Sequence, residues 1–242
     1  MAKCISCDRY DWIVLVAFAA ASSIVFGPSF GRIFTSDDYC TLEYVCREGH
    51  FLVPGFFRPV GDLTLKWTWK IAGWQPFYFF LGNALLHAIN SWLLFLLCRR
   101  LYADRQKAFW FAGAASVIFF SYHSHGEAIL WAIGRGISLA TFFALCSMAV
   151  FLSRIRETWK MLAVCLCYFL ALASYESVAL LPGILWLLPG ATRDNRDFRK
   201  WWIALGITLL VSVGLREIYS GGVWMAYRGS IFWKEPVAYV SD

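Results

Sequence analysis

The sequence predicts an all-α protein, a polytopic transmembrane helical bundle of about seven spans. Of its 242 residues, 60% are hydrophobic and 16% are charged, whereas a soluble domain is nearer to half apolar and about a quarter charged. Short loops rich in arginine and lysine separate seven apolar runs, at about 12–34, 76–98, 108–122, 137–153, 160–174, 177–190 and 201–216. The net charge of +6 is therefore interpreted as a topology signal rather than a sign of nucleic-acid binding.

Three basic clusters predict the orientation of the chain. They lie at 99–107, 154–160 and 193–200, and all three should face the cytoplasm by the positive-inside rule. An even number of crossings must separate each pair, so 108–153 and 160–190 are each expected to cross twice. The first run is then an uncleaved signal-anchor helix, the N-terminus is cytoplasmic, 35–75 form a large external loop and 217–242 an external tail. The whole chain, 1–242, is expected to be a single transmembrane domain.

The external loop carries two amphipathic patterns. Apolar side chains recur at helical spacing in two sets: Tyr39, Leu42, Val45 and Cys46, and Leu63, Trp67, Ile71 and Trp74. Both segments are predicted to be helices that lie in the membrane interface.

Cysteine and histidine give little support for a metal site. Cys40 and Cys46 could form a disulfide if the loop is extracytoplasmic, whereas Cys4 and Cys7 form a lone C-x-x-C that cannot complete a four-ligand zinc site. His123 and His125 are two residues apart, which is not a convincing ligand spacing.

Two adjacent carboxylates, Asp37 and Asp38, follow the first apolar run in "TSDDYC". Ser36 or Asp37 would suit a helix N-cap, so a structural role stays open. Neighbouring residues on a helix point in different directions. One carboxylate could therefore act as a general base while the other orients it or binds a cation.

Three further charged residues are candidates on the same side. Arg58, in "GFFRPVGDL", either reaches the interface along its apolar stem or binds a phosphate with its guanidinium fork. Arg135, in "WAIGRGIS", stands between two glycines that would let a bulky head group approach the backbone. Glu127 lies eight residues earlier and would share a face with Arg135 if the stretch is helical, as a functional acid or in a structural ion pair.

Polar residues inside the second run are expected to pack helices together. Asn83, His87 and Asn90, in "GNALLHAIN", are interpreted as hydrogen-bonding groups between neighbouring helices. The sequence has no Walker motif, HExxH motif or nucleophile elbow.

These segments together resemble the GT-C superfamily of membrane glycosyltransferases. The resemblance rests on "DDY", "FFRPVGDLTLKWTWKIAGWQPFYFFLGNALLHAIN", "SYHSHGEAILWAIGRGISLATFFAL" and "ALASYESVALLPGILWLL", in this order over about residues 10 to 190. It is closest to the protein O-mannosyltransferase-like branch, which includes the transmembrane and tetratricopeptide-repeat O-mannosyltransferases. Tyr175 stands where the family usually has a lysine. Family members usually carry more spanning helices, so this chain is expected to be shortened at its C-terminus.

The resemblance implies transfer of a sugar from a polyprenyl-phosphate donor to an acceptor hydroxyl on the extracytoplasmic face. It places the base at Asp38 or Asp37, an orienting acid at Glu127, and donor-phosphate contacts at Arg58 and Arg135. No metal ligand is assigned, although some relatives in the wider superfamily use a divalent cation at an acidic pair. The expected partners are the polyprenyl-phosphate sugar donor, membrane lipid, an unknown acceptor and a further membrane protein, with no nucleic acid. The expected location is a bacterial inner membrane or its equivalent.

A non-catalytic membrane protein is the alternative. It would be either a component of a lipid-sugar carrier or a shortened pseudo-enzyme that scaffolds a full transferase. Ionisable residues in spanning segments also mark transport pathways. Against a carrier, the charges here gather on one face of the membrane, and no inverted repeat is evident.

Overall fold

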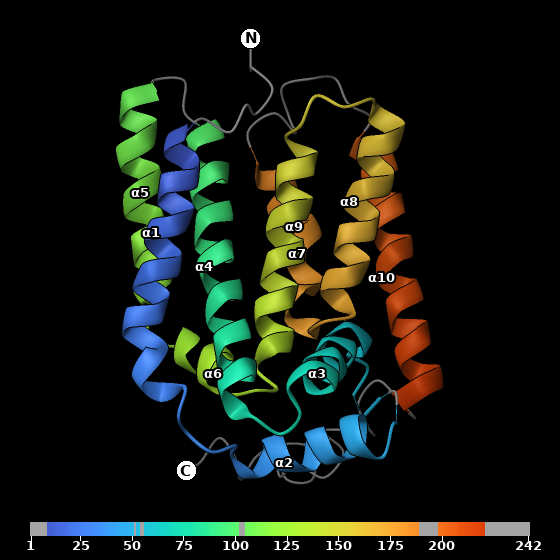
Figure 1. Cartoon of the computed structure of the whole chain (residues 1–242). Helices are drawn as coiled ribbons and strands as arrows, with labels where there is room; N and C mark the ends of the chain where they lie inside the picture. Colours follow the sequence, from blue (N-terminus) through green and yellow to red (C-terminus); the bar gives the residue numbers. More distant parts are fainter. Residues whose placement is uncertain (1–8, 51, 54–55, 102–104, 189–197, 221–242) are drawn as a thin grey trace, which may run out of the picture.

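The computed structural model describes residues 9–50, 52–53, 56–101, 105–188 and 198–220, and every regular element in these ranges is helical. Helices that run side by side form a bundle (Figure 1): α1 (Arg9–Phe26), α4 (Pro76–Leu101), α5 (Arg105–Ser121), α7 (Arg135–Phe151), α8 (Glu157–Leu172), α9 (Leu181–Leu187) and α10 (Phe198–Ser220). Short 3-10 turns, Gly27–Ser29 and Glu176–Leu180, follow α1 and precede α9. The prediction of an all-α fold is confirmed.

Three helices among the described residues are long and apolar enough to cross a membrane. They are Arg9–Ser29, Pro76–Leu101 and Phe198–Tyr219, while Arg135–Phe151 and Glu176–Leu187 are apolar but shorter. Large apolar side chains such as Ile24, Trp110 and Leu210 are more than two-thirds exposed on the outside of the bundle, as lipid contact requires. The chain is therefore a membrane protein, whereas the count of seven spans and the cytoplasmic N-terminus stay predictions.

The helices predicted in the loop after α1 are present. They are α2 (Ser36–Leu42), continued by the π-helical turn Glu43–Arg47, and α3 (Pro59–Ala72). Together with α6 (His125–Leu130), they gather at the end of the bundle where α1 finishes and α4 begins (Figure 1). The two apolar patterns differ in what they contact: Leu42 and Val45 are buried in a core cluster, whereas Trp67 and Ile71 are exposed.

Helix α4 is the centre of the bundle and packs against α1, α5 and α7. Polar side chains on its buried face bond to the neighbouring chain segments. Asn83 donates to the Trp131 carbonyl over 2.7 Å and Asn90 to the Ser138 carbonyl over 2.8 Å, and the His87 Nε2 lies 3.1 Å from the Phe120 carbonyl. The predicted packing role of these three residues is confirmed. Arg99 at the other end of α4 forms an ion pair with Asp11 of α1.

Arg135 joins α7 to both α3 and α4. Its side chain is buried (5% exposed) at the first residue of α7. The guanidinium donates to Asn83 Oδ1 over 2.8 Å, to the Phe79 carbonyl over 2.9 Å and to Thr68 Oγ1 over 2.6 Å. A further bond of 3.2 Å reaches the Thr64 carbonyl. A buried charge needs such a set of partners, and these bonds hold the start of α7 in one position.

The two glycines beside Arg135 allow close backbone contact within the protein. A Cβ atom at Gly134 would lie 2.6 Å from the Glu127 carbonyl oxygen, and one at Gly136 would lie 2.8 Å from the Ser174 carbonyl oxygen. Neighbouring backbone therefore fills the space beside each glycine where a side chain would lie. The sequence analysis had expected a head group to approach there.

Replacing Arg135 by alanine should destabilise the protein by on the order of 3 kcal/mol, because buried acceptors on α3 and α4 would lose their donors. Arg135→Lys should recover only part of this loss, because an ammonium cannot reproduce the guanidinium fork. Thermal unfolding of the purified protein in detergent measures the effect. Arg154→Ala, at an exposed arginine, is the control and should leave the unfolding midpoint unchanged.

Replacing Gly136 by alanine should lower the unfolding midpoint, by about 1–3 kcal/mol of overpacking, because the new methyl group meets the Ser174 carbonyl. Gly113→Ala in α5 is the matched control, since no atom lies within 4 Å of its Cβ position. That change should instead add about 0.5–1 kcal/mol through better helix propensity. Equal effects at both sites would contradict the packing described for Gly136.

Candidate functional site

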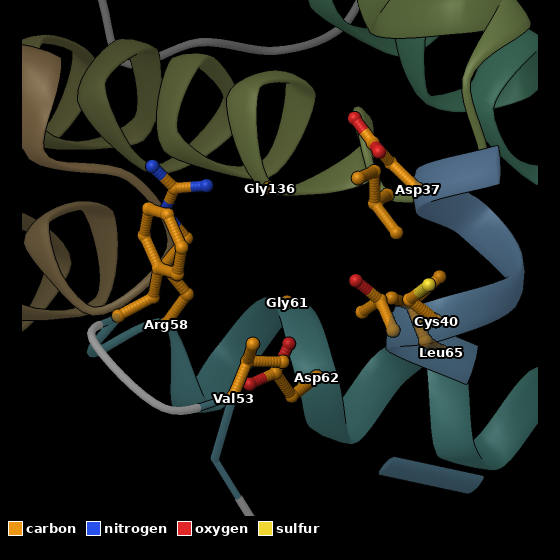
Figure 2. A pocket seen from close by; sticks show the side chains of 11 residues that line it. Asp37, Cys40, Val53, Arg58, Gly61, Asp62, Leu65 and Gly136 are labelled. Atoms are coloured by element: carbon orange, nitrogen blue, oxygen red, sulfur yellow. The ribbon is translucent and has the colours of Figure 1, made fainter. Parts of the chain in front are cut away.

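A cavity of about 240 Å³ lies between α2, α3 and the start of α7 (Figure 2). The segment just before α3 completes its wall. Polar and apolar side chains line it: Asp37, Cys40, Thr41, Val53, Phe56, Arg58, Gly61, Asp62, Leu65, Ile133 and Gly136. Two of the five residues that the sequence singled out, Asp37 and Arg58, therefore face one cavity.

Asp38 fixes the helix that carries Asp37. It is fully buried (0% exposed), and its Oδ2 accepts hydrogen bonds from the Thr35 backbone N–H (3.2 Å) and the Thr35 hydroxyl (3.1 Å). Its Oδ1 accepts a bond from the Ile133 backbone N–H over 3.1 Å. Both oxygens of Asp38 are thus engaged with the protein, so its carboxylate caps α2 and ties it to the segment before α7.

Asp37 is exposed and lines the cavity. Figure 2 shows it at the α2 side, across the cavity from Arg58. The adjacent acids therefore differ, as the sequence analysis allowed. Both oxygens of Asp38 bond within the protein, whereas Asp37 is accessible from the cavity.

Arg58 is held by an ion pair and two aromatic rings. Its Nη2 lies 2.8 Å from Glu176 Oε1, and its Nε donates to Glu176 Oε2 over 3.2 Å. The guanidinium carbon lies 4.6 Å from the centre of the Phe56 ring and 4.1 Å from that of Tyr175. Arg216 of α10 also approaches Glu176, at 3.5 Å. The Glu176 carboxylate therefore accepts hydrogen bonds along one edge of the Arg58 guanidinium, where the sequence analysis expected a phosphate.

Tyr175 acquires a role that the sequence left open. Its ring stacks on the Arg58 guanidinium. Such a cation–π contact stabilises a positive charge by about 0.5–2 kcal/mol. The aromatic ring therefore helps to hold Arg58 at the edge of the cavity.

Arg135 and Glu127 are not among the residues that line this cavity. The guanidinium of Arg135 makes its bonds with α3 and α4 instead, and Glu127 is exposed on α6. Helix α6 ends at Leu130 and Trp131 is extended before α7 begins. The condition for Glu127 and Arg135 to share a face, one continuous helix, is therefore not met.

Asp62 is a cavity residue that the sequence analysis did not assign. It is only 6% exposed, it lines the cavity, and its Oδ2 has no hydrogen-bond partner among the described residues. Burial raises the pKa of Asp62 to about 7, although a backbone hydrogen bond from Val53 and the charge of Arg58 act to lower it. The signal in the sequence was the spacing of three residues that line the cavity. Asp62 lies four residues after Arg58, which directly precedes α3, and three residues before Leu65. The exposed Trp67 lies on the opposite face of α3.

The cysteines of this region are free thiols. Cys40 is exposed at the cavity and Cys46 is buried, and neither forms a disulfide. Burial raises the pKa of the Cys46 thiol to about 11. Cys4 and Cys7 lie outside the described residues, and within those residues no group of three or more His, Cys, Asp or Glu side chains could hold a metal.

Two curated proteins of Drosophila melanogaster are similar to this chain. Protein O-mannosyl-transferase Tmtc1 is 28% identical over 151 residues, which cover 59% of this chain and 17% of that protein. Protein O-mannosyl-transferase Tmtc2 is 28% identical over 159 residues, which cover 65% of this chain and 13% of that protein. No family model and no solved structure matches the chain. The chain thus spans less than a fifth of these relatives, and the likeness supports the O-mannosyltransferase-like branch of glycosyltransferases.

Proposed function

We propose that this chain is a glycosyltransferase that moves a sugar from a polyprenyl-phosphate donor to an acceptor hydroxyl at the cavity. The observation that carries the proposal is the division between two adjacent acids. Asp37 is accessible from the cavity, whereas Asp38 is buried with both oxygens bound. A base on a helix that its neighbour holds in place is the preorganised arrangement that proton transfer requires.

Asp37 is the base in this proposal. Its carboxylate takes the proton of the acceptor hydroxyl while the hydroxyl oxygen forms a bond to the anomeric carbon of the sugar. The bond from that carbon to the phosphate oxygen breaks, and its electron pair leaves with the polyprenyl phosphate. Asp38 is a positioning residue that acts by fixing α2.

Arg58 supplies the positive charge that the leaving phosphate needs. Glu176 receives bonds from its Nε and Nη2, and a guanidinium has five N–H donors, so donors remain that a phosphate at the cavity could use. Fixed donors at a site of developing negative charge stabilise the transition state. The contacts of Arg135 favour a structural role over phosphate binding, and the position of Glu127 on α6 does not favour contact with the donor.

A lipid-linked donor agrees with the membrane character of the chain. Residues of α2 and α3 line the cavity, and these helices gather at one end of the bundle (Figure 1), so a polyprenyl tail could stay in the bilayer while its phosphate reaches Arg58. Assignment of this end to the extracytoplasmic side belongs to the proposal and rests on the basic clusters at the other ends of the helices.

Replacing Asp37 by asparagine should reduce release of polyprenyl phosphate from polyprenyl-phosphate-mannose by about 10²–10⁴-fold, because the base is lost. The purified chain in lipid nanodiscs, with a hydroxyl acceptor and with or without divalent cation, provides the assay. Asp38→Asn should lower both the rate and the unfolding midpoint, whereas Asp37→Asn should lower the rate alone.

Glu43→Gln is the matched control, because Glu43 directly follows α2 and pairs only with exposed Arg47 among the described residues. It should retain the wild-type rate. Full activity of Asp37→Asn would remove Asp37 as the base. A folded wild-type chain with no turnover would favour the scaffold, and transfer of lipid-linked sugar between leaflets by both asparagine variants would favour a carrier.

A further inference from the structure

Asp62 faces the candidate site but has no part in the reaction proposed above. It lies on α3, four residues after Arg58, and one of its carboxyl oxygens is directed toward the interior of the cavity in Figure 2. Asp37 of α2 and Gly136 of α7 line other parts of the same cavity. Three elements therefore surround a space into which this buried acid points.

The oxygen without a partner is the feature that a purely structural role leaves unexplained. Val53 contributes a backbone hydrogen bond to the Asp62 carboxyl group, yet Oδ2 is buried and finds no partner among the described residues. Leaving a buried polar atom unsatisfied destabilises the folded state. Most buried polar atoms have a partner, so an exception at a cavity is a place where a ligand atom would complete the set.

We propose that Asp62 binds the sugar of the donor, with its carboxyl group donating a hydrogen bond to a sugar hydroxyl in the cavity. This inference rests on the function proposed above. The cavity of about 240 Å³ is smaller than the ~300–1,000 Å³ of typical sites for drug-sized ligands. It therefore suits one sugar ring rather than an oligosaccharide.

The surroundings of Asp62 favour its neutral form more than those of an exposed aspartate do. Burial raises its pKa to about 7, and the charge of Arg58 opposes this. Arg58, however, is already shared with Glu176. The other titratable groups near the carboxyl group are Lys66 on α3, Asp37 and Cys40 on α2, and Cys46 on the π-helical turn. In this arrangement Asp62 donates a hydrogen bond to the sugar, while Asp37 acts as the base.

Ionisation of Asp62 would weaken donor binding in two ways. The carboxylate has no proton to donate, and its negative charge would lie in the same cavity as the donor phosphate. The KM for the lipid-linked sugar should therefore rise as the pH increases through about 7, whereas the effect on kcat should be smaller.

Steady-state kinetics of three proteins in nanodiscs tests this role. Between pH 6 and pH 8.5, the donor KM of the wild type should rise by about tenfold, which is what the loss of one good hydrogen bond produces. Asp62→Asn keeps a neutral N–H donor and should hold KM constant over this range. Asp62→Leu has no donor and should show a raised KM at both pH values. A wild-type pH profile that Asp62→Asn reproduces would overturn the proposal.

A binding measurement separates this inference from the proposed reaction. Cys40 is exposed in the same cavity, so a bound ligand should protect it from a maleimide, with the modified site identified by mass spectrometry. Polyprenyl-phosphate-mannose should protect Cys40 better than polyprenyl phosphate without sugar. Asp62→Leu should abolish that difference while Glu43→Gln retains it.

Each outcome of the labelling decides one point. Sugar-dependent protection that requires Asp62 supports the inference even if the chain has no turnover, in which case only the proposed reaction fails. Equal protection of wild type and Asp62→Leu by polyprenyl-phosphate-mannose would overturn the inference. Loss of protection by both lipids in Asp62→Leu would assign Asp62 to the phosphate and would also overturn it.

The pH dependence of stability provides an independent prediction. A carboxyl group whose pKa is raised from 3.8 to about 7 on folding favours the folded state below pH 3.8, and this contribution disappears as the pH rises through 7. The unfolding midpoint of the wild type should therefore fall relative to that of Asp62→Asn between pH 5 and pH 8. Gly113→Ala, which removes no titratable group, should parallel the wild type. A constant difference between wild type and Asp62→Asn would contradict a neutral Asp62.

Discussion

The arrangement of the candidate site depends on one buried guanidinium. Arg135 bonds simultaneously to α4 through Asn83 and Phe79 and to α3 through Thr64 and Thr68. Asn83 in turn bonds to the Trp131 carbonyl just before α7. Because a buried charge is tolerated only with its full set of partners, these bonds give the three helices a single relative position. These bonds therefore also fix the cavity wall that α3 and the start of α7 form.

Charge is distributed unevenly around the cavity. The carboxylate of Asp38 is used within the fold, and that of Glu176 is shared by two arginines. Among the acids that the structure describes, Asp37 and Asp62 line the cavity. Burial separates these last two, since Asp62 is buried and Asp37 is exposed. Two acids of the same chemical type thus have different surroundings within one site, and burial raises the pKa of Asp62.

Hydrophobic patterning was sufficient to predict the helices, because burial and lipid exposure both act on runs of apolar residues. It also placed Asp37 and Arg58 in one loop, between the first and second apolar runs. Hydrophobic patterning does not predict in which direction a polar side chain points. Whether Asp37 or Asp38 faces the cavity depends on Thr35 and on the Ile133 amide, which is 95 residues away. Arg135 was assigned to a ligand because two of its four acceptors are backbone carbonyls, which no sequence pattern reveals. Asp62 was overlooked because an acid in the first turn of a helix usually needs no further explanation.

The bond between Arg58 and Glu176 has a consequence for biogenesis. The two residues are 118 positions apart in the chain, and the Val60 amide bonds to the Ala173 carbonyl beside them over 3.2 Å. During synthesis, the loop after α1 must therefore wait for α8 and the following turn before α3 can reach its final contacts. Until then Arg58 lacks its carboxylate and the cavity lacks a fixed wall. The nascent chain thus acquires its site late, after most of the bundle has been inserted, and an intermediate released before residue 176 would contain both Asp37 and Asp62 without the ion pair that aligns Arg58 with them.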